Sequence, residues 1–252
     1  MLEEIRHADV LELRLERPPA NALSPELIAA LEKAVRSAPS RGAKGLVLSG
    51  RPGMFSAGLD VPLFVQLDRR GARAAWRGFL DLMQALAVVP IPLACAITGH
   101  APAGGCVLAF CSHWRVMAQG SFKIGLNEVA VGVRVPEMVW AAARHAVGTR
   151  IAERLCTGAE LLESETAFRL GMVDELVAPD EVVPRARKWV ESQLALPPVT
   201  LRNTRELARR ELADSFAACD DATLDAFLDE WFGEESQAAL KATVARLTSK
   251  KK

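Results

Sequence analysis

Two short loops, each placed directly after an apolar run, constrain the fold of this chain most strongly. FSAGLD (Phe55–Asp60) follows the run GLVLSG, and GHAPAGGC (Gly99–Cys106) follows the run PLACAIT. Short apolar runs that end in turn residues are typical of buried strands. The second loop leads into an apolar segment of helical length. The pattern predicts an α/β fold in which helical crossovers join a mainly parallel sheet.

The rest of the chain continues this alternation and then becomes mostly helical. We expect strands at Val10–Arg17, Gly45–Ser49, Leu93–Thr98, Trp114–Ala118 and Val173–Val177, and a long helix over Ala72–Ala87. Ser24 followed by proline and glutamate predicts the start of an earlier helix. Pro197-Pro198 is the best linker, so we expect a core over 1–196 and a helical region over 197–252.

Composition excludes several classes of function. Lys+Arg and Asp+Glu both number 31, so no excess charge favours nucleic acid or an anionic membrane. Apolar runs are broken before membrane-spanning length, and the acidic amino terminus does not resemble a signal peptide. The five cysteines and four histidines lack metal-ligand spacing, which predicts no metal site. These features indicate a reducing, cytoplasmic setting.

The two loops also suggest chemistry. Ligands of parallel sheets bind outside the carboxyl ends of the strands, where both loops fall. Ala57 and Gly58 let the backbone approach a ligand, and Gly104 and Gly105 open a helix whose first N–H groups lack partners. Either loop alone also fits an ordinary glycine turn. Together they favour a site where two backbone donors hold a developing oxyanion.

Five motifs carry a resemblance to a known family. They are LERPPANALS (Leu15–Ser24), FSAGLD, GHAPAGGC, KIGLNEVAVG (Lys123–Gly132) and TGAELLESETAFRLGMVDELV (Thr157–Val177). Their order and spacing resemble those of the crotonase superfamily, and within it the mitochondrial-type 3,2-trans-enoyl-CoA isomerases. The resemblance implies a crotonase-like spiral of ββα or βαβ units, followed by a helical carboxyl-terminal region.

The resemblance also implies a ligand and its contacts. Proteins of this kind bind acyl-CoA thioesters, and coenzyme A belongs to the substrate, so no separate cofactor is implied. By motif position, the N–H groups of Ala57 and Gly104 hold the enolate oxygen. The positions implied to line the substrate site are Ala22, Phe55, Ala57, Gly58, Leu59, Asp60, Gly105, Val107 and Leu126.

The choice of reaction depends on two positions. Hydratases of this superfamily use two glutamates, one just after the glycine loop and one in the segment that matches GLNE. Here the first position is Val107 and the second is Glu128. One carboxylate suffices to move a proton from the α to the γ carbon, whereas activation of water uses both. The resemblance therefore implies a β-oxidation isomerase that converts 3-enoyl-CoA to 2-trans-enoyl-CoA. For Glu128 alone, a surface carboxylate in a turn is the alternative.

Other departures keep further functions open. His113 stands where the family usually has aspartate, and Glu137 stands where it usually has a small or apolar residue. Glu137 follows Pro136 and favours a helix start. It could instead be a second acid, which would point to a hydratase or another crotonase-type reaction. A non-catalytic acyl-CoA-binding oligomer is the third hypothesis.

The carboxyl-terminal helix carries an apolar stripe. Leu224, Phe227, Leu228 and Trp231 recur at helical spacing. The stripe must pack on the body of the chain or on another subunit. The resemblance implies a homotrimer or a dimer of trimers, in which the last helices complete the subunit contacts and cover this stripe.

Overall fold

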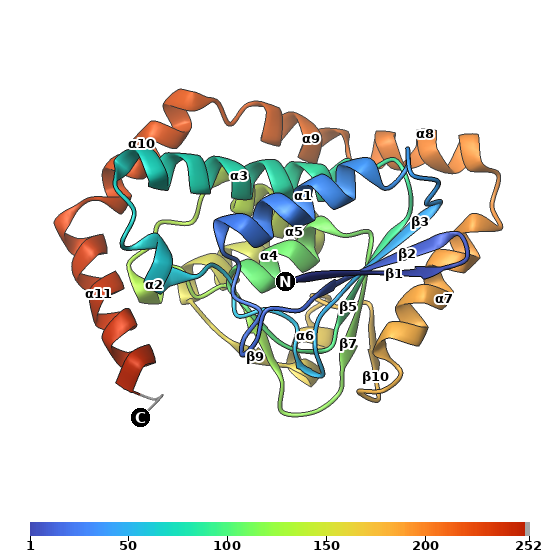
Figure 1. Ribbon diagram of the computed structural model, residues 1–252, viewed down its shortest axis with the longest axis horizontal. Coiled ribbons are helices and arrows are strands. Elements are labelled where there is room, and N and C mark those ends of the chain that lie inside the picture. Colours follow the sequence, from blue (N-terminus) through green and yellow to red (C-terminus); the bar gives the residue numbers. More distant parts are fainter. Residues whose placement is uncertain (250–252) are drawn as a thin grey trace.

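The computed structural model describes residues 1–249, in which two sheets are surrounded by helices (Figure 1). The larger sheet has the order β1-β2-β3-β5-β7-β10 and is parallel except for β1. Its strands are β1 (Leu2–His7), β2 (Val10–Leu15), β3 (Gly45–Ser49), β5 (Leu93–Ile97), β7 (Trp114–Ala118) and β10 (Glu175–Val177). The smaller sheet contains β4 (Gly53–Met54), β6 (Gly99–Pro102), β8 (Lys123–Gly125) and β9 (Leu162–Glu163).

The helices fill the connections between these strands and form the carboxyl-terminal region. They are α1 (Pro25–Ser37), α2 (Val61–Phe64), α3 (Arg69–Ala87), α4 (Gly104–Cys111), α5 (Glu137–Gly158), α6 (Ser164–Arg169), α7 (Val182–Leu194), α8 (Pro198–Ala208), α9 (Arg210–Ala217), α10 (Asp221–Trp231) and α11 (Glu234–Ser249). A short 3₁₀ helix, η1, covers Val129–Val131.

The chain repeats one unit along a spiral. A strand of the larger sheet is followed by a short strand of the smaller sheet and then by a helix, as in β3–β4–α2, β5–β6–α4 and β7–β8–η1. Each unit therefore brings a turn and a helix start to the same end of the sheet. This arrangement confirms the predicted α/β spiral.

Alternating side chains divide the core into two parts. In β3, Leu46 and Leu48 belong to the larger cluster, which includes residues of α1, α3 and α4. Val47 points to the opposite face, where it packs in a smaller cluster with residues of α7. This period of two is what a strand buried on both faces requires. The sheet is thus covered by α7 on one face and by the main helical layer on the other (Figure 1).

Capping side chains near the helix ends explain where α1 and α3 begin. Ser24 caps α1 as predicted, and its Oγ accepts a hydrogen bond from the Leu27 N–H at 3.4 Å. Helix α3 begins at Arg69, three residues before the predicted start, because the Asp68 side chain accepts from the Gly71 N–H at 2.7 Å. Strand β1 was not predicted, although it pairs along its whole length with β2.

The apolar stripe of α10 packs inside the chain. Phe227 and Trp231 are buried against Trp76 of α3, with ring centroids 4.6 and 5.4 Å from that indole. Leu224 and Leu228 are buried beside them. The expectation that other subunits cover this stripe is therefore wrong, because α10 folds back onto α3 of the same molecule (Figure 1).

Two other expectations concern the chain as a whole. Within residues 1–249, no helix combines the length and the apolar composition that crossing a bilayer requires. The predicted division at residue 197 falls at the start of α8 and remains a prediction. The last three residues of the predicted 197–252 region lie outside the described residues.

Candidate active site

Nearly all backbone N–H groups of the FSAGLD loop donate hydrogen bonds within the chain. The acceptors are His100 O for Phe55 (3.0 Å) and Ser56 (3.3 Å), Ala20 O for Ala57 (2.9 Å), Ser56 Oγ for Gly58 (3.2 Å) and Leu23 O for Asp60 (3.1 Å). Leu59 is the exception, since its N–H has no partner within residues 1–249. The predicted donor role of Ala57 is thus corrected, because the Ala20 carbonyl already occupies that N–H.

The second donor begins helix α4. Gly104 is the first residue of this helix, and no side chain caps its amino terminus. The Gly104 N–H has no acceptor among the described residues, as the geometry of a helix start dictates. Ala103, just before it, has a φ of 50° and is fixed by a 2.8 Å hydrogen bond from its N–H to the Gly125 carbonyl. The strained turn therefore leaves Gly104 free to donate.

The two free donors lie side by side. A Cβ placed on Gly104 would lie 3.3 Å from the Leu59 nitrogen, and a Cβ placed on Gly58 would lie 2.8 Å from the Gly104 nitrogen. Gly58 also has a φ of +84°, which disfavours any side chain. The glycines thus let two backbone nitrogens from different loops approach one another. Two adjacent unpaired donors are what stabilisation of an oxyanion requires.

Glu128 supplies the titratable group. It follows β8 and stands directly before η1. The residue as a whole is half-buried, but its Oε2 is inaccessible and has no hydrogen-bond partner in the described chain. Burial raises the pKa of this carboxyl to about 7, while the backbone N–H groups of Glu128 and Asn127 act in the opposite direction. A carboxyl with this pKa can both accept and donate a proton near neutral pH.

The surroundings of Glu128 place it beside α4. After burial, the charge of Glu128 is the largest cause that raises the pKa values of the Cys106 and Cys156 thiols. Cys106 belongs to the first turn of α4, which starts at the free Gly104 donor. Val107, the next residue, is buried and apolar. The site therefore combines two backbone donors with one carboxyl group at this turn.

Glu137 lies in different surroundings. It opens α5, which confirms the interpretation as a helix start, and its Oε1 accepts from Arg134 at 2.7 Å. The Arg134 guanidinium also reaches Glu230 of α10 at 3.0 Å. The charge of Glu137 acts on Cys219, near the start of α10, whereas that of Glu128 acts on Cys106 and Cys156. The two carboxylates thus act on different cysteines, and of the two only Glu128 has a buried oxygen without a partner in the described chain.

The predicted substrate positions divide by burial. Gly58, Gly105, Val107 and Leu126 are buried, whereas Ala22, Leu59 and Asp60 are half-buried around the loop. Asp60 binds Arg17 at 2.7 Å and caps α2 through the Leu63 N–H. Phe55 is buried in the core, and its N–H and carbonyl are both hydrogen-bonded within the chain. The predicted contact of Phe55 with substrate is therefore corrected to a role in fixing the loop.

Asn21 lies within the LERPPANALS motif, and its role becomes visible only in the folded chain. It is buried with a φ of 49°, a conformation that asparagine tolerates better than most residues. Its Nδ2 donates to the carbonyls of Leu15 and Phe55, both at 3.0 Å, and its Oδ1 accepts from the Arg17 N–H at 2.9 Å. Asn21 thereby joins the end of β2 to the FSAGLD loop. Only its motif position, between Ala20 and Ala22, hinted at this.

Comparison with known proteins places this geometry in a family. The family described as "Enoyl-CoA hydratase/isomerase" matches residues 5–246. The chain belongs to this family. This match confirms the resemblance that the motifs indicate. Within residues 1–249, no group of three or more His, Cys, Asp or Glu side chains is arranged to hold a metal ion.

The relatives of this family member include proteins named as isomerases and proteins named as hydratases. Rat "Enoyl-CoA delta isomerase 1, mitochondrial" is 31% identical over 258 residues, covering 100% of this chain and 88% of the relative. The mouse protein of the same name is 33% identical, covering 97% and 86%. A probable enoyl-CoA hydratase from Mycobacterium avium is 34% identical over 188 residues, covering 73% and 72%.

Among solved structures, human mitochondrial delta3-delta2-enoyl-CoA isomerase superposes with a TM-score of 0.95. That alignment covers 100% of this chain and 99% of the human one, at 26% identity. An enoyl-CoA isomerase from Mycobacterium tuberculosis gives a TM-score of 0.82 at 26% identity, covering 91% and 98%. This family member therefore shares the whole fold of the human isomerase, including the carboxyl-terminal helices.

Proposed function

We propose that this protein is an enoyl-CoA isomerase, which converts 3-enoyl-CoA to 2-trans-enoyl-CoA in fatty acid β-oxidation. The relatives from rat and mouse carry the name of such an isomerase. The observation that carries the proposal is the buried Glu128 carboxyl, whose charge acts on Cys106 in the first turn of α4, where the next residue is the apolar Val107. A double-bond shift needs one group that moves one proton, and this site supplies one.

The proposed reaction begins with proton removal. Ionised Glu128 takes a proton from the α carbon of the 3-enoyl thioester, and the electron pair of that C–H bond moves into the carbonyl. The resulting dienolate oxygen accepts hydrogen bonds from the Leu59 and Gly104 N–H groups. Protonated Glu128 then returns the proton to the γ carbon, and the double bond forms between the α and β carbons. No separate cofactor takes part, because coenzyme A belongs to the substrate.

Hydration is the second candidate reaction, and the surroundings of Glu137 argue against it. A hydratase needs a second acid to position and activate water, and Val107 cannot move a proton. Glu137 accepts a hydrogen bond from Arg134. Its charge acts on the Cys219 thiol, whereas that of Glu128 acts on Cys106 and Cys156. A non-catalytic acyl-CoA-binding protein would not need the buried, unpartnered Oε2 of Glu128, which costs stability in the folded state.

A pair of matched substitutions tests the proposed reaction. Glu128→Gln keeps the shape of the side chain but removes the base, so kcat on 3-enoyl-CoA is expected to fall about 10²- to 10⁴-fold. Glu137→Gln, the same change at an acid outside the site, is expected to keep turnover within about twofold of the parent value. The measurement follows formation of 2-enoyl-CoA by the purified proteins.

Three outcomes would contradict the proposed reaction. Full turnover by Glu128→Gln would remove the role of this base. Hydration of 2-enoyl-CoA that is lost in Glu137→Gln would replace the isomerase by a hydratase. Binding of acyl-CoA by the parent protein without turnover on either thioester would favour the non-catalytic alternative.

We further propose a homotrimer or a dimer of trimers, on the strength of the family resemblance alone. The cytoplasmic location stays a prediction, since the rat and mouse relatives carry the word "mitochondrial" in their names. Light scattering on the purified protein would give the number of copies.

A further inference from the structure

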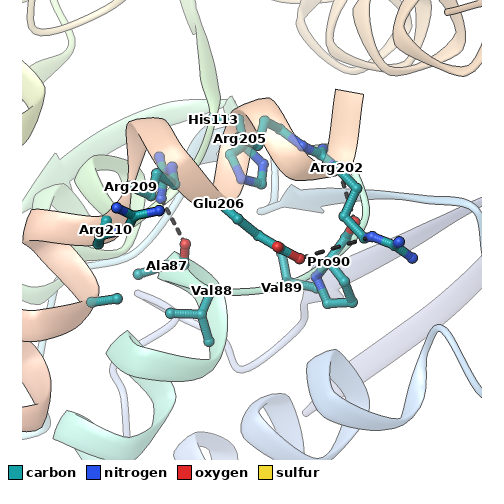
Figure 2. Close-up of a pocket in the computed structure, with 11 residues that line it drawn as sticks. Ala87, Val88, Val89, Pro90, His113, Arg202, Arg205, Glu206, Arg209 and Arg210 are labelled. Atoms are coloured by element: carbon teal, nitrogen blue, oxygen red, sulfur yellow. Dashed lines mark hydrogen bonds and ion pairs between the residues drawn. The ribbon is translucent and has the colours of Figure 1, made fainter. Parts of the chain in front are cut away.

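A cavity lies at the end of α4 that is remote from the free Gly104 donor. It has a volume of about 200 Å³ and is bounded by the apolar turn Ala87–Pro90, by His113 and by the facing side of α8 and α9 (Figure 2). Helix α4 runs from Gly104 at the candidate active site to Cys111 near this cavity. Eight residues of helix span about 12 Å, so the cavity is separate from the active site.

The lining of this cavity is strongly cationic. Arg202, Arg205, Arg209 and Arg210 contribute to it, whereas Glu206 is the only acid in the lining (Figure 2). Glu206 lies 3.9 Å from Arg202, and its charge also acts on Arg205, so it offsets part of the positive charge. The chain as a whole has equal numbers of acidic and basic residues. The excess of positive charge is therefore local to this cavity.

One of these arginines has a structural role. Arg209 donates to the carbonyls of Ala87 at 3.0 Å and Cys111 at 2.9 Å, and it also binds Ser112 O. It thereby satisfies the carboxyl-terminal ends of α3 and α4, which have no intrahelical donors. Burial, together with the charges of Arg115 and Arg205, lowers the pKa of Arg209 to about 10. This guanidinium has no need of a ligand.

Arg205 and His113, in contrast, retain free donors. Arg205 Nη2 donates to the Pro90 carbonyl at 2.8 Å, but its Nη1 is inaccessible and has no partner in the described chain. His113 Nδ1 accepts from the Leu93 N–H at 2.9 Å. Burial and the charges of Arg209 and Arg205 lower the pKa of His113 well below its usual value, so the ring is neutral. Its hydrogen therefore resides on Nε2, which has no acceptor within residues 1–249.

We infer that this cavity binds a phosphate group, with the buried Arg205 Nη1 and the His113 Nε2 as donors and with Arg202 and Arg210 at its exposed rim. Guanidinium and imidazole N–H groups are strong donors to the oxygens of a phosphate. Besides Arg209, the lining contains three positive charges, those of Arg202, Arg205 and Arg210. Their N–H groups are more numerous than the hydrogen bonds that a single carboxylate could accept. Inorganic phosphate and a small phosphate monoester share this chemistry.

Calorimetric titration of the purified protein tests the inference without any thioester substrate. The probes are inorganic phosphate and glycerol 3-phosphate, each compared with chloride at equal ionic strength. We expect saturable binding of phosphate and none of chloride. Tighter binding of glycerol 3-phosphate would identify a monoester as the natural source, and tighter binding of inorganic phosphate would identify the free ion.

Substitutions locate the binding to this cavity. Arg205→Gln removes the buried donor, and His113→Asp places a carboxylate beside the arginines, so each is expected to weaken phosphate binding at least about tenfold. Arg246→Gln removes the same charge from an exposed position on α11 and should leave the affinity within about twofold. Turnover on 3-enoyl-CoA, or the parent midpoint of thermal unfolding, would show that each variant is folded.

The inference is independent of the proposed isomerase activity. Absence of phosphate binding by an active parent enzyme would overturn it, as would equal affinities of the parent, Arg205→Gln and His113→Asp proteins. If a carboxylate of a second copy fills the cavity, phosphate will not bind, and the inference is then wrong. Phosphate binding by a protein without isomerase turnover would leave it intact.

Discussion

At the scale of single residues, the ionisation of Glu128 should set the pH dependence of turnover. Burial raises the pKa of this carboxyl from 4.5 to about 7, so the protonated form dominates in acid. Only the ionised form can remove the α proton. Measured on 3-enoyl-CoA, kcat/KM of the free enzyme should therefore rise with pH through about 7 and level off above it. A profile that is flat between about pH 5.5 and 8.5 would contradict this assignment.

The sequence could indicate Glu128 because its proposed role depends on a local motif, GLNE, and on the residue type at position 107. It could not separate Leu59 from Ala57 as a donor. That difference depends on which N–H is taken by a carbonyl of Ala20, a residue distant in sequence. The same limit hid the role of Asn21, whose side chain binds two segments that meet only in the folded chain. Phe55 was misassigned because a motif does not reveal burial.

At the scale of elements, the close contact between α4 and the FSAGLD loop should be sensitive to one methyl group. A Cβ at Gly105 would lie 2.5 Å from the Ser56 carbonyl oxygen, and backbone atoms cannot move aside easily. Gly105→Ala should therefore shift α4 away from the loop, separating the Leu59 and Gly104 donors. We expect kcat on 3-enoyl-CoA to fall at least about tenfold and the stability to fall by about 1–3 kcal/mol.

Gly78→Ala provides the control for this substitution. A Cβ there would meet only Ile28 Cγ2, at 3.7 Å, inside the long helix α3. Alanine favours a helix interior, so this variant should be as stable as the parent or more stable by up to about 1 kcal/mol. Its turnover should be unchanged. Normal turnover by Gly105→Ala would show that the loop and α4 are not held as closely as the structure indicates.

Element boundaries were predictable where their signals are local. The hydroxyl of Ser24 marks the start of α1, and the apolar run at Gly45–Ser49 marks β3. Strands β4, β6 and β8 have only two to four residues each, so they carry no periodic pattern of their own. They exist because neighbouring turns of the spiral bring their backbones together. Strand β1 was missed because no residue of LEEIRH is fully buried, and this segment becomes a strand through pairing with β2.

At the scale of the molecule, the carboxyl-terminal helices have two structural roles: they bury part of α3, and they provide hydrogen-bond donors to the ends of α3 and α4. Helix α10 covers the indole of Trp76 on α3, and Arg209, between α8 and α9, satisfies the ends of α3 and α4. Helix α4 therefore has the free Gly104 N–H at its first turn and a hydrogen-bond donor from Arg209 at its last. The sequence could show that α10 is amphipathic. The sequence could not show which surface the apolar stripe packs against, because such a stripe could equally well pack against another subunit.

Truncation of the α10 stripe tests whether it packs within one molecule or between subunits. Trp231→Ala removes a buried indole from the contact with Trp76, so it should lower the free energy of unfolding by about 3–5 kcal/mol. Leu247→Ala, at a half-exposed position on α11, should change it by less than about 1 kcal/mol. Because the stripe packs within one molecule, light scattering should give the Trp231→Ala protein the same number of subunits as the parent. Dissociation to monomers at the same protein concentration would instead show that this stripe holds copies of the chain together.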